Sequence, residues 1–351
     1  MIKLSDLRLN AGSFNLAVDA LELRAGEALA IIGPNGAGKT TLLNAIAMLR
    51  EPSSGTLEIM GKDALSADNR RFLRREMSVV FSQPYLVSDT VYNNVALPLR
   101  LRSRSDEDAV NGALELFQIA HLRDRDAGSL SQGESHRAAL ARAFVTKPKL
   151  LLLDEPFSSL DERVRDSIVR DLRKGLKASR ASVVFVTQDQ AGALALCDRL
   201  AVLVNGKLLQ QGAPQEIFAR PASKEVADFV GVETILNGEV SAKSDNLCSV
   251  RVGAATLEVV SECDAGDQVL LCVRPEAVSV SKAAEANSMR NHFKGKIKSI
   301  EPWRLEYKLS LDCGFNLIAA VTKRSLDDMG LKPGDELFAS FKATAAHLIR
   351  R

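Results

Sequence analysis

Short apolar runs alternate with stretches of helical periodicity along roughly the first two thirds of the chain. The runs are rich in Val, Ile and Leu, and most of them lack the polar positions of a half-exposed strand; they lie at 28–32, 78–81, 150–153, 182–186 and 200–204. Such runs are typical of parallel strands covered by helices on both faces. We therefore predict an α/β domain with a largely parallel sheet over residues 1–232.

The pattern changes after Val232, where short alternating strands are broken by Gly, Asn and Asp. Segments 236–240, 257–260 and 295–300 are examples. They predict an all-β domain over residues 233–351.

A weak internal repeat runs through this all-β part. Residues 237–240 resemble 294–297, and the stretch 266–274 resembles 334–342 in its apolar and basic positions. Repeated segments of this kind predict repeated structural units. We expect two tandem β units, about 235–282 and 288–351, joined by an Ala- and Ser-rich connector at 281–287.

A glycine-rich loop follows the first buried run and precedes a helix-like stretch at 41–49. It matches the pattern GxxxxGK[ST], for which a chance match in a chain of this length has odds of about one in a hundred. Backbone amides of such a loop surround phosphates, Lys39 reaches the β- and γ-phosphates, and the Thr40 hydroxyl ligates Mg²⁺. The predicted ATP-binding residues of the loop are Gly33, Pro34, Asn35, Gly36, Ala37, Gly38, Lys39, Thr40 and Thr41.

Two carboxylates follow the apolar run at 150–153. In a parallel sheet they lie near the phosphate loop, where Asp154 can hold Mg²⁺ through water and Glu155 can polarise the attacking water. An acidic strand end is common in proteins, but together with the phosphate loop it indicates nucleotide hydrolysis.

Composition narrows the range of functions. A length of 351 residues suggests two or three folding units, and a net charge of only +2 provides no basic field for nucleic acid. The five cysteines show no metal-ligand spacing, which suits a reduced cytoplasmic setting. We expect no signal peptide and no membrane span, so work at a membrane requires docking onto other subunits.

Residues 130–134, Leu-Ser-Gln-Gly-Glu, resemble the LSGGQ signature of ABC ATPases. Other elements of that family follow in order: Gln83 resembles its Q-loop glutamine, 159–161 its D-loop, and Gln188 stands where its switch histidine is usual. The resemblance implies a P-loop NTPase fold with a helical subdomain at about 84–145. It also implies a head-to-tail homodimer in which Ser131 and Gly133 cover the γ-phosphate bound by the partner.

Several of these residues have two interpretations. Ser131 is also an ordinary N-cap for the helix that follows it. The resemblance implies that Gln83 contacts ATP and Mg²⁺ and that Phe14 stacks on adenine, although Phe14 also suits a strand core. Gln188 cannot become cationic or relay a proton, so we expect slower hydrolysis with Glu155 as the water-polarising group.

The resemblance extends to a membrane importer. Residues 84–91 and 94–97 resemble the segment by which import ATPases grip a permease, with a buried helical core as the alternative. The arginines at 70, 71, 74 and 75 are interpreted as a solvated face. The family setting implies a peripheral protein on the cytoplasmic face of the cell membrane, served indirectly by an extracytoplasmic substrate-binding protein.

The C-terminal part resembles a TOBE domain, and residues 288–295 resemble the SARNxxxG segment of molbindin-type oxyanion-binding domains. Ser288, Arg290, Lys342 and Thr344 can supply the hydroxyls and cations that a tetrahedral dianion needs. The chain is most similar to ATPases of molybdate or tungstate importers, in which this domain can also inhibit transport when the oxyanion is abundant.

Other functions stay open at this point. An importer of sulfate, iron or a sugar is one alternative, since TOBE domains also occur there. A soluble ABC ATPase of DNA repair or translation is a second, but the chain has neither paired cassettes nor a long coiled-coil insertion. A P-loop kinase has no use for the signature or the D-loop.

Overall fold

The computed structural model describes residues 1–12, 14–158, 160–283, 288–303 and 305–351. The chain divides into two compact units, Met1–Ile217 and Phe218–Arg351. The division falls inside helix α8 (Pro214–Ala219), ahead of the boundary at residue 232, which stays a prediction. The connector predicted at 281–287 lies partly outside the described residues, and its first residue, Ser281, ends a strand.

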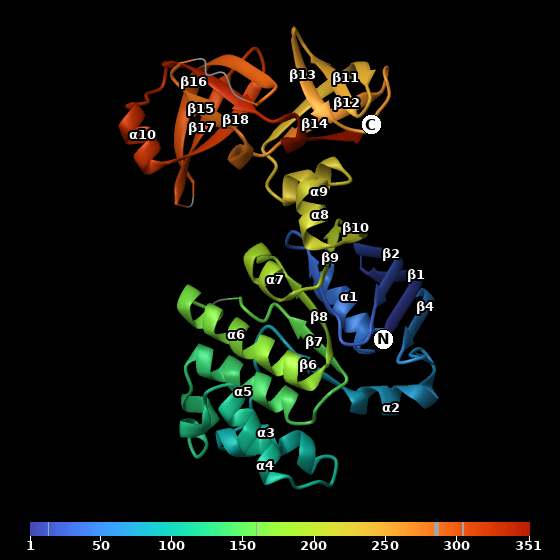
Figure 1. The fold of residues 1–351 in the computed structure, drawn as a ribbon. Coiled ribbons are helices and arrows are strands. Elements are labelled where there is room, and N and C mark those ends of the chain that lie inside the picture. The colour runs from blue at the N-terminus through green and yellow to red at the C-terminus, as the bar shows by residue number, and fades with distance from the viewer. Residues whose placement is uncertain (13, 159, 284–287, 304) are drawn as a thin grey trace. The chain divides into compact units, whose positions relative to one another are not determined.

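The centre of the first unit is a block of parallel strands in the order β9–β3–β8–β7–β6 (Figure 1). Every residue of β3, β7 and β8 is buried, as the unbroken apolar runs predicted. Their register pairs Ile32 with Thr187 and Asp154 with Val186, so the carboxyl ends of these strands meet at one edge of the sheet. The bounds are β3 Ala28–Ile32, β6 Met77–Val80, β7 Leu150–Asp154, β8 Ser182–Thr187 and β9 Arg199–Val204.

An antiparallel part extends the same sheet in the order β5–β4–β1–β2–β10, and only β10 with β2 pairs in parallel here. Helix α1 (Lys39–Ile46) shares one core with both parts of the sheet, because its Leu42, Leu43 and Ile46 belong to the apolar cluster of the strands. The bounds are β1 Ile2–Ala11, β2 Phe14–Leu23, β4 Ser54–Ile59, β5 Lys62–Asp63 and β10 Lys207–Gly212.

Helices fill the long connection between β6 and β7. Helices α3 and α4 both pack against α5, which also contacts α6 and β6. Helices α3, α4 and α5 lie within the residues of the predicted helical subdomain. The remaining helices of this unit precede β6 or flank β8. The bounds are α2 Ala67–Glu76, α3 Val91–Arg100, α4 Glu107–Leu116, η1 Ala120–Leu122, η2 Ala127–Ser129, α5 Gln132–Phe144, α6 Glu162–Ser179 and α7 Gln190–Leu196.

The second unit begins with the end of α8 and α9 (Lys224–Phe229) and continues as two antiparallel sheets. Their strand orders are β13–β12–β11–β14–β20 and β15–β19–β16–β17–β18. The bounds are β11 Thr234–Ser244, β12 Leu247–Val252, β13 Ala255–Val260, β14 Gln268–Val273, η3 Pro275–Ala277, β15 Ser279–Ser281, β16 Asn291–Trp303, β17 Glu306–Asp312, β18 Asn316–Thr322, α10 Lys323–Met329, β19 Glu336–Phe341, η4 Ala343–Ala345 and β20 Ala346–Arg350.

The internal repeat has a direct structural counterpart. The Val240 amide donates to Asp267 O at 3.0 Å, and the Ile297 amide donates to Asp335 O at 2.9 Å. In return, the Gly266 amide donates to Val240 O and the Gly334 amide donates to Ile297 O, each at 2.8 Å. Matching bonds at matching positions mean that the two halves have the same local fold.

The last strand of each half pairs with the sheet of the other half. Strand β20 pairs with β14, where His347 lies opposite Cys272, and β15 pairs with β19, where Val280 lies opposite Ala339. One apolar cluster also contains residues of both halves, including Leu271. Because strands and core are shared, the two β units form one structure.

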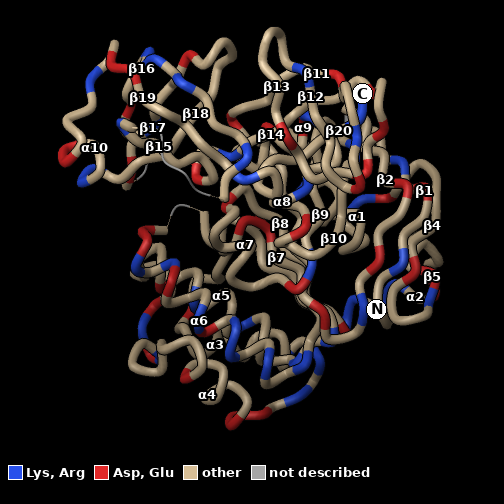
Figure 2. Tube along the Cα trace, turned by 45° about the horizontal axis from the view of Figure 1, so that its top comes forward, with Lys and Arg blue, Asp and Glu red and all other residues tan. Residues whose placement is uncertain are grey.

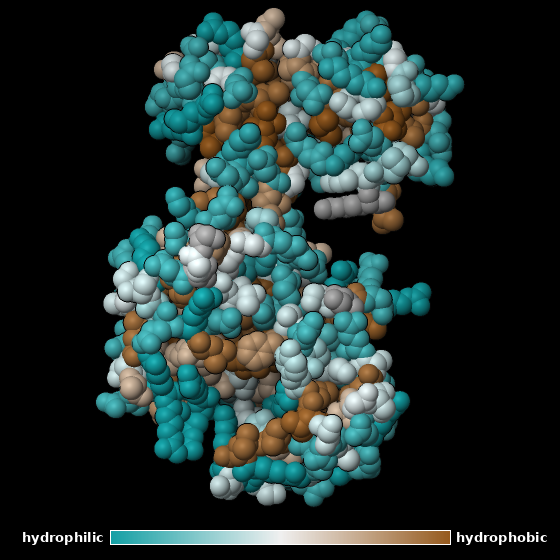
Figure 3. Space-filling model, turned by 180° about the vertical axis from the view of Figure 1, so that it is seen from behind, coloured by the Kyte–Doolittle hydropathy of each residue, from teal (hydrophilic) through white to brown (hydrophobic). Residues whose placement is uncertain are grey.

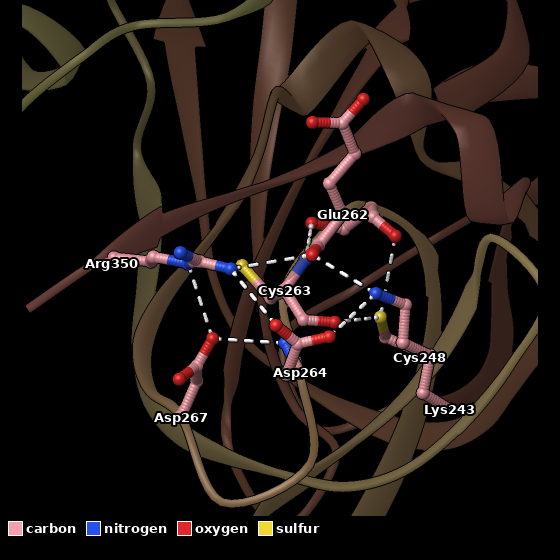
Figure 4. A network of polar contacts seen from close by, with 8 residues as sticks. Lys243, Cys248, Glu262, Cys263, Asp264, Asp267 and Arg350 are labelled. Atoms are coloured by element: carbon pink, nitrogen blue, oxygen red, sulfur yellow. Dashed lines mark hydrogen bonds and ion pairs between the residues drawn. The ribbon is translucent and has the colours of Figure 1, made fainter.

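A polar network fixes the C-terminal strand to the loop before β14 (Figure 4). The Arg350 guanidinium lies 3.1 Å from the Asp267 carboxylate and 3.5 Å from that of Asp264. Lys243 Nζ lies 2.8 Å from Asp264 and donates to Glu262 O at 3.0 Å. These pairs are exposed, so they specify the position of the strand more than they stabilise it.

The surface of the chain carries both signs of charge, interspersed along the trace (Figure 2). Hydrophobic side chains gather on part of the first unit's surface (Figure 3). Among the residues that the structure describes, no helix combines the length and the apolar character that a membrane span requires.

Candidate functional site

The glycine-rich loop connects β3 to α1, as its sequence context predicted. A Cβ atom on Gly33 would lie 1.9 Å from Leu203 O, so only glycine fits at the start of the loop. Gly38, the N-cap of α1, has φ 98°, a left-handed conformation that side chains rarely adopt. Pro34, Asn35, Gly36 and Ala37 lie between these two glycines, and Lys39, Thr40 and Thr41 form the first turn of α1. The first backbone amides of a helix have no partner within the helix.

Lys39 is buried and held by its own loop. Its Nζ donates to Gly33 O at 2.9 Å and to Pro34 O at 3.2 Å, and it lies 3.7 Å from Glu155 Oε1. Only 6% of the Lys39 side chain is exposed, so this ammonium group is already desolvated and oriented at the mouth of the loop. Such a cation is suited to an anionic ligand.

Thr40 and Asp154 form the next contact of the site. The Thr40 hydroxyl donates to Asp154 Oδ1 at 2.9 Å, and Asp154 is 5% exposed at the end of β7. Burial raises the pKa of the Asp154 carboxyl, although the Thr40 hydroxyl and Lys39 act in the opposite direction. A buried carboxylate beside a hydroxyl is an oxygen donor set of the kind that Mg²⁺ prefers.

The described residues contain no group of three or more His, Cys, Asp or Glu side chains that could hold a metal ion. Thr40 and Asp154 together supply two oxygen ligands, so a cation held there would take its other ligands from phosphate and water.

Glu155 follows Asp154 in a strained conformation, with φ 45°. Its amide donates to Val186 O at 2.9 Å, which anchors the residue to β8. Its Oε2 accepts from the Thr187 hydroxyl at 3.1 Å and from the Gln188 amide at 3.3 Å. The carboxylate is thus held at the edge of the sheet, beside Lys39.

Gln188 lies at the carboxyl end of β8 with an exposed side chain. The structure brings it next to Glu155 through its backbone. The Thr187 contact was missed by sequence reasoning, and its only sequence signal is a Thr at the end of the run that precedes Gln188.

Phe14 lies beside the phosphate loop. A Cβ on Gly38 would lie 2.7 Å from the end of the Phe14 ring, and the ring is partly buried against the main apolar cluster. This position is compatible with both interpretations of Phe14. Gln83 follows β6, the neighbour of β7, and its side chain is exposed.

The signature residues belong to a different group of elements. Ser131 is the N-cap of α5, and its side chain forms a capping box with Glu134. The Ser131 amide donates to Glu134 Oε2 at 2.8 Å, and this bond is the main reason that the pKa of Glu134 is lowered. Helix α5 packs against α3, α4, α6 and β6, whereas α1 packs against β7 and β8.

Ser131 and Gly133 line a surface hollow of about 290 Å³ together with residues of α6. The capping box confirms the N-cap interpretation of Ser131, and the same residue also lines this concave surface. Of the predicted D-loop, Asp161 is the N-cap of α6, Leu160 is half-buried, and Ser159 lies outside the described residues.

The four predicted oxyanion residues lie on exposed positions of the second unit. Strands β16 and β19 pair with Asn291 opposite Phe341, which places Arg290 and Lys342 at the same end of the pair. The Arg290 guanidinium contacts Glu258 at 3.2 Å.

Thr344 lies in η4, and Ser288 precedes β16. Asn291 is buried and exchanges hydrogen bonds of 2.8 Å with the backbone of Glu258. Within the SxRN segment, this residue therefore has a structural role.

Comparisons with known proteins agree with this geometry. A model of the ABC transporter family matches residues 16–158, and a model of the TOBE domain matches residues 287–348. The molybdate/tungstate import ATP-binding protein WtpC of Pyrococcus horikoshii is 33% identical over 99% of this chain and 99% of its own. The spermidine/putrescine import ATP-binding protein PotA of Nitrosomonas europaea is also 33% identical, again over 99% of both chains.

The sulfate/thiosulfate import ATP-binding protein CysA of Bacillus cereus is 32% identical over 97% of this chain and 96% of its own. Among solved structures, cbiO1 of Clostridium perfringens, part of an ABC transporter complex, aligns with a TM-score of 0.58 and 31% identity, covering 66% of this chain and 94% of that one.

A dimeric ATP-binding cassette bound to ADP and Pi aligns with a TM-score of 0.55 and 27% identity, covering 61% of this chain and 99% of that one. The family match over residues 16–158 covers the phosphate loop, the paired carboxylates and helix α5. The chain has a C-terminal TOBE domain, and its ATP hydrolysis is coupled to transport. It belongs to the ABC transporter family, as an ATP-binding import subunit.

Proposed function

We propose that this chain hydrolyses ATP with Mg²⁺ to power the import of molybdate or tungstate. The observation that carries the ATP site is the convergence of Lys39, Thr40, Asp154 and Glu155 at one edge of the sheet. Lys39 and Thr40 belong to the first turn of α1, and Asp154 and Glu155 stand at the end of β7, far from α1 in the sequence. Each supplies one of the parts that phosphoryl transfer needs.

The loop residues bind the phosphates through backbone amides and the ammonium of Lys39. Thr40 and Asp154 would hold Mg²⁺, with Gln83 as a further ligand, and the ion supplies charge neutralisation at the β- and γ-phosphates. Phe14 provides an aromatic face beside the loop for adenine. Nucleotide binding competes with the three oxygens that now hold Lys39, so the loop exchanges internal bonds for bonds to phosphate.

Glu155 orients and polarises the attacking water in this proposal. Its carboxylate is held by Thr187 and by the Gln188 amide, and neither contact uses the Gln188 side chain. The absence of an imidazole at this position removes a cationic hydrogen-bond donor. Hydrolysis is accordingly slow, while ATP binding through the loop is preserved.

The active form in this proposal is a homodimer. A related cassette has been solved as a dimer, and Ser131 and Gly133 line a concave surface instead of packing on the chain's own phosphate loop. In the head-to-tail arrangement, the Ser131 hydroxyl and the N-terminus of α5 cover the γ-phosphate of the partner site.

A membrane permease is the proposed second partner, bound at the cytoplasmic face of the cell membrane. Tyr85 and Val87 of the predicted docking segment are 74% and 46% exposed, and Leu101 is 76% exposed. A nearby hollow of about 530 Å³ is lined by the arginines at 70, 71, 74, 75 and 102 together with Pro98 and Leu101. Its arginines suit a partner segment that carries carboxylates.

The proposals of an oxyanion cargo and of a regulatory oxyanion site rest mainly on the C-terminal part of the chain. WtpC, a molybdate/tungstate import protein, resembles this chain along its full length. Lys342 and Thr344 are exposed, and the Arg290 guanidinium lies 3.2 Å from the half-exposed carboxylate of Glu258, so a dianion must compete with that carboxylate for Arg290. In the first half the position that matches Lys342 is Arg274, which is half-buried and donates to Phe218 O and Val230 O.

Titration calorimetry on the full-length chain tests the oxyanion site. We expect molybdate and tungstate to bind, with sulfate much weaker, and Lys342→Ala to abolish the heat without altering ATP affinity. Lys323→Ala, an exposed lysine of α10, is the matched control and should bind normally. If neither anion binds the wild-type chain, or if sulfate or spermidine binds instead, the proposed oxyanion is wrong and the cargo resembles that of CysA or PotA.

A further inference from the structure

Thr187, the last residue of β8, has a role that no motif assigns to it. Its side chain is buried, with 1% of its surface exposed. The Thr187 hydroxyl donates to Glu155 Oε2 at 3.1 Å, and it accepts a hydrogen bond from the Asp189 amide at 3.0 Å. A buried hydroxyl with both functions satisfied is an oriented donor.

The direction of this donor is determined by its surroundings. The amide of Asp189 can only donate, so it occupies a lone pair of the Thr187 oxygen. A carboxylate oxygen can only accept, so the hydroxyl proton points at Glu155. The bond is charge-assisted, and bonds of this kind are stronger and more directional than bonds between neutral groups.

The turn that carries Thr187 is itself anchored. Asp189 caps helix α7 by accepting the Ala191 amide at 3.1 Å, and its other oxygen lies 3.7 Å from the Arg165 guanidinium of α6. Glu155, by contrast, sits at a strained φ and its other carboxylate oxygen faces Lys39. Thr187 thus connects a fixed turn to a carboxylate that has an alternative partner.

We infer that Thr187 is a positioning residue for ATP hydrolysis, which holds the Glu155 carboxylate in place when Lys39 turns from it to the nucleotide phosphates. This inference rests on the proposed role of Glu155. Because Gln188 contributes only its amide to Glu155, the Thr187 hydroxyl is the one side chain described as donating a hydrogen bond to this carboxylate. A water that Glu155 polarises is only as well placed as the carboxylate itself.

Steady-state ATPase kinetics on the full-length chain test the inference. Thr187→Val keeps the shape of the side chain and removes the hydroxyl, whereas Thr187→Ser keeps the hydroxyl and removes the methyl group. We expect Thr187→Val to lower kcat at least about tenfold with little change in the KM for ATP, since orientation of a general base is lost while the phosphate loop is intact. Thr187→Ser should retain most of the activity.

Ser182→Ala is the matched control. Ser182 begins the same strand, is fully buried, accepts the Gly26 amide at 2.8 Å and donates to Arg24 O at 3.3 Å, but it lies at the end of β8 away from Glu155. Its kcat should stay near that of the wild type. If Ser182→Ala and Thr187→Ser lower kcat as much as Thr187→Val does, the effect is one of strand stability and the inference is overturned.

A Glu155→Gln variant separates this inference from the proposed function. If Glu155→Gln hydrolyses ATP at the wild-type rate, the proposed role of Glu155 fails, and the inference fails with it. If Glu155→Gln is inactive but Thr187→Val retains the wild-type kcat, only the inference is wrong. In the double variant, Thr187→Val should add no further loss, because both changes act on the same step.

Discussion

The buried ion pair between Arg137 of the signature helix and Asp171 of α6 provides a quantitative test of how burial determines stability in this fold. Arg137 Nη1 lies 2.7 Å from Asp171 Oδ2, and the two side chains are 12% and 2% exposed. Asp171 also accepts two contacts from Gln118 Nε2, at 2.8 and 2.9 Å. The carboxylate therefore fixes two segments against α6.

Asp171→Ala leaves the guanidinium of Arg137 buried without a counter-charge. Breaking such a pair by removing one partner costs about 3–5 kcal/mol. For a unit of 217 residues, each kcal/mol lowers Tm by about 2–4 °C, so a loss of about 4 kcal/mol corresponds to roughly 8–16 °C. The replacement of both partners, Arg137→Met with Asp171→Leu, should recover most of this loss because no charge stays buried.

The matched control is another Arg–Asp pair of the same length. Arg8 and Asp19 also lie 2.7 Å apart, but their side chains are 40% and 81% exposed. Asp19→Ala should therefore cost about 0–1 kcal/mol. Thermal and chemical unfolding of the three variants measures both effects. Equal destabilisation by Asp171→Ala and Asp19→Ala would refute the reasoning that burial sets the difference.

Two further predictions concern the ATP site. Gln188→His should raise kcat about tenfold or more with the KM for ATP unchanged. The reason is that it adds a cationic donor on a backbone whose amide already contacts Glu155. An unchanged turnover rate contradicts our interpretation of Gln188. Burial raises the pKa of Asp154, so its contribution to stability is present below the unfolded pKa and is lost as the pH rises through the folded pKa. Asp154→Asn should therefore raise the Tm of the nucleotide-free chain at pH 8 by more than at pH 4, which lies close to the ordinary carboxyl pKa of 3.8. The same variant should lose the Mg²⁺-dependent stabilisation by ATP. Scanning calorimetry at both pH values measures this, and a Tm gain that is independent of pH is the contrary result.

The sequence predicted the parallel strands well, because strands buried on both faces have an unbroken apolar composition that periodicity detects. The internal repeat was also visible, since Gly266 and Gly334 occupy the same turn in each half. The exchange of β15 and β20 between halves was not predictable. A strand as short as β15 has no local signal for its partner, which is decided by the shared core.

In the candidate site, too, some residues were predictable from the sequence and others were not. Short motifs identify Lys39, Thr40, Asp154 and Glu155, because phosphate binding requires particular residue types at fixed spacing within each motif. Thr187 carries no such signal, because its importance comes from the register of β7 against β8. Likewise, the contact between Arg290 and Glu258 joins residues from both halves of the repeat, and no sequence pattern links them.

ATP-dependent uptake of labelled oxyanion is the most direct test of the central proposal, measured in membrane vesicles that contain this chain together with its permease and substrate-binding protein. The account predicts uptake of molybdate or tungstate that requires ATP, is lost in Lys39→Ala, and is not competed by excess sulfate or spermidine. Transport of sulfate or spermidine in place of either oxyanion, or uptake that persists in Lys39→Ala, would contradict it.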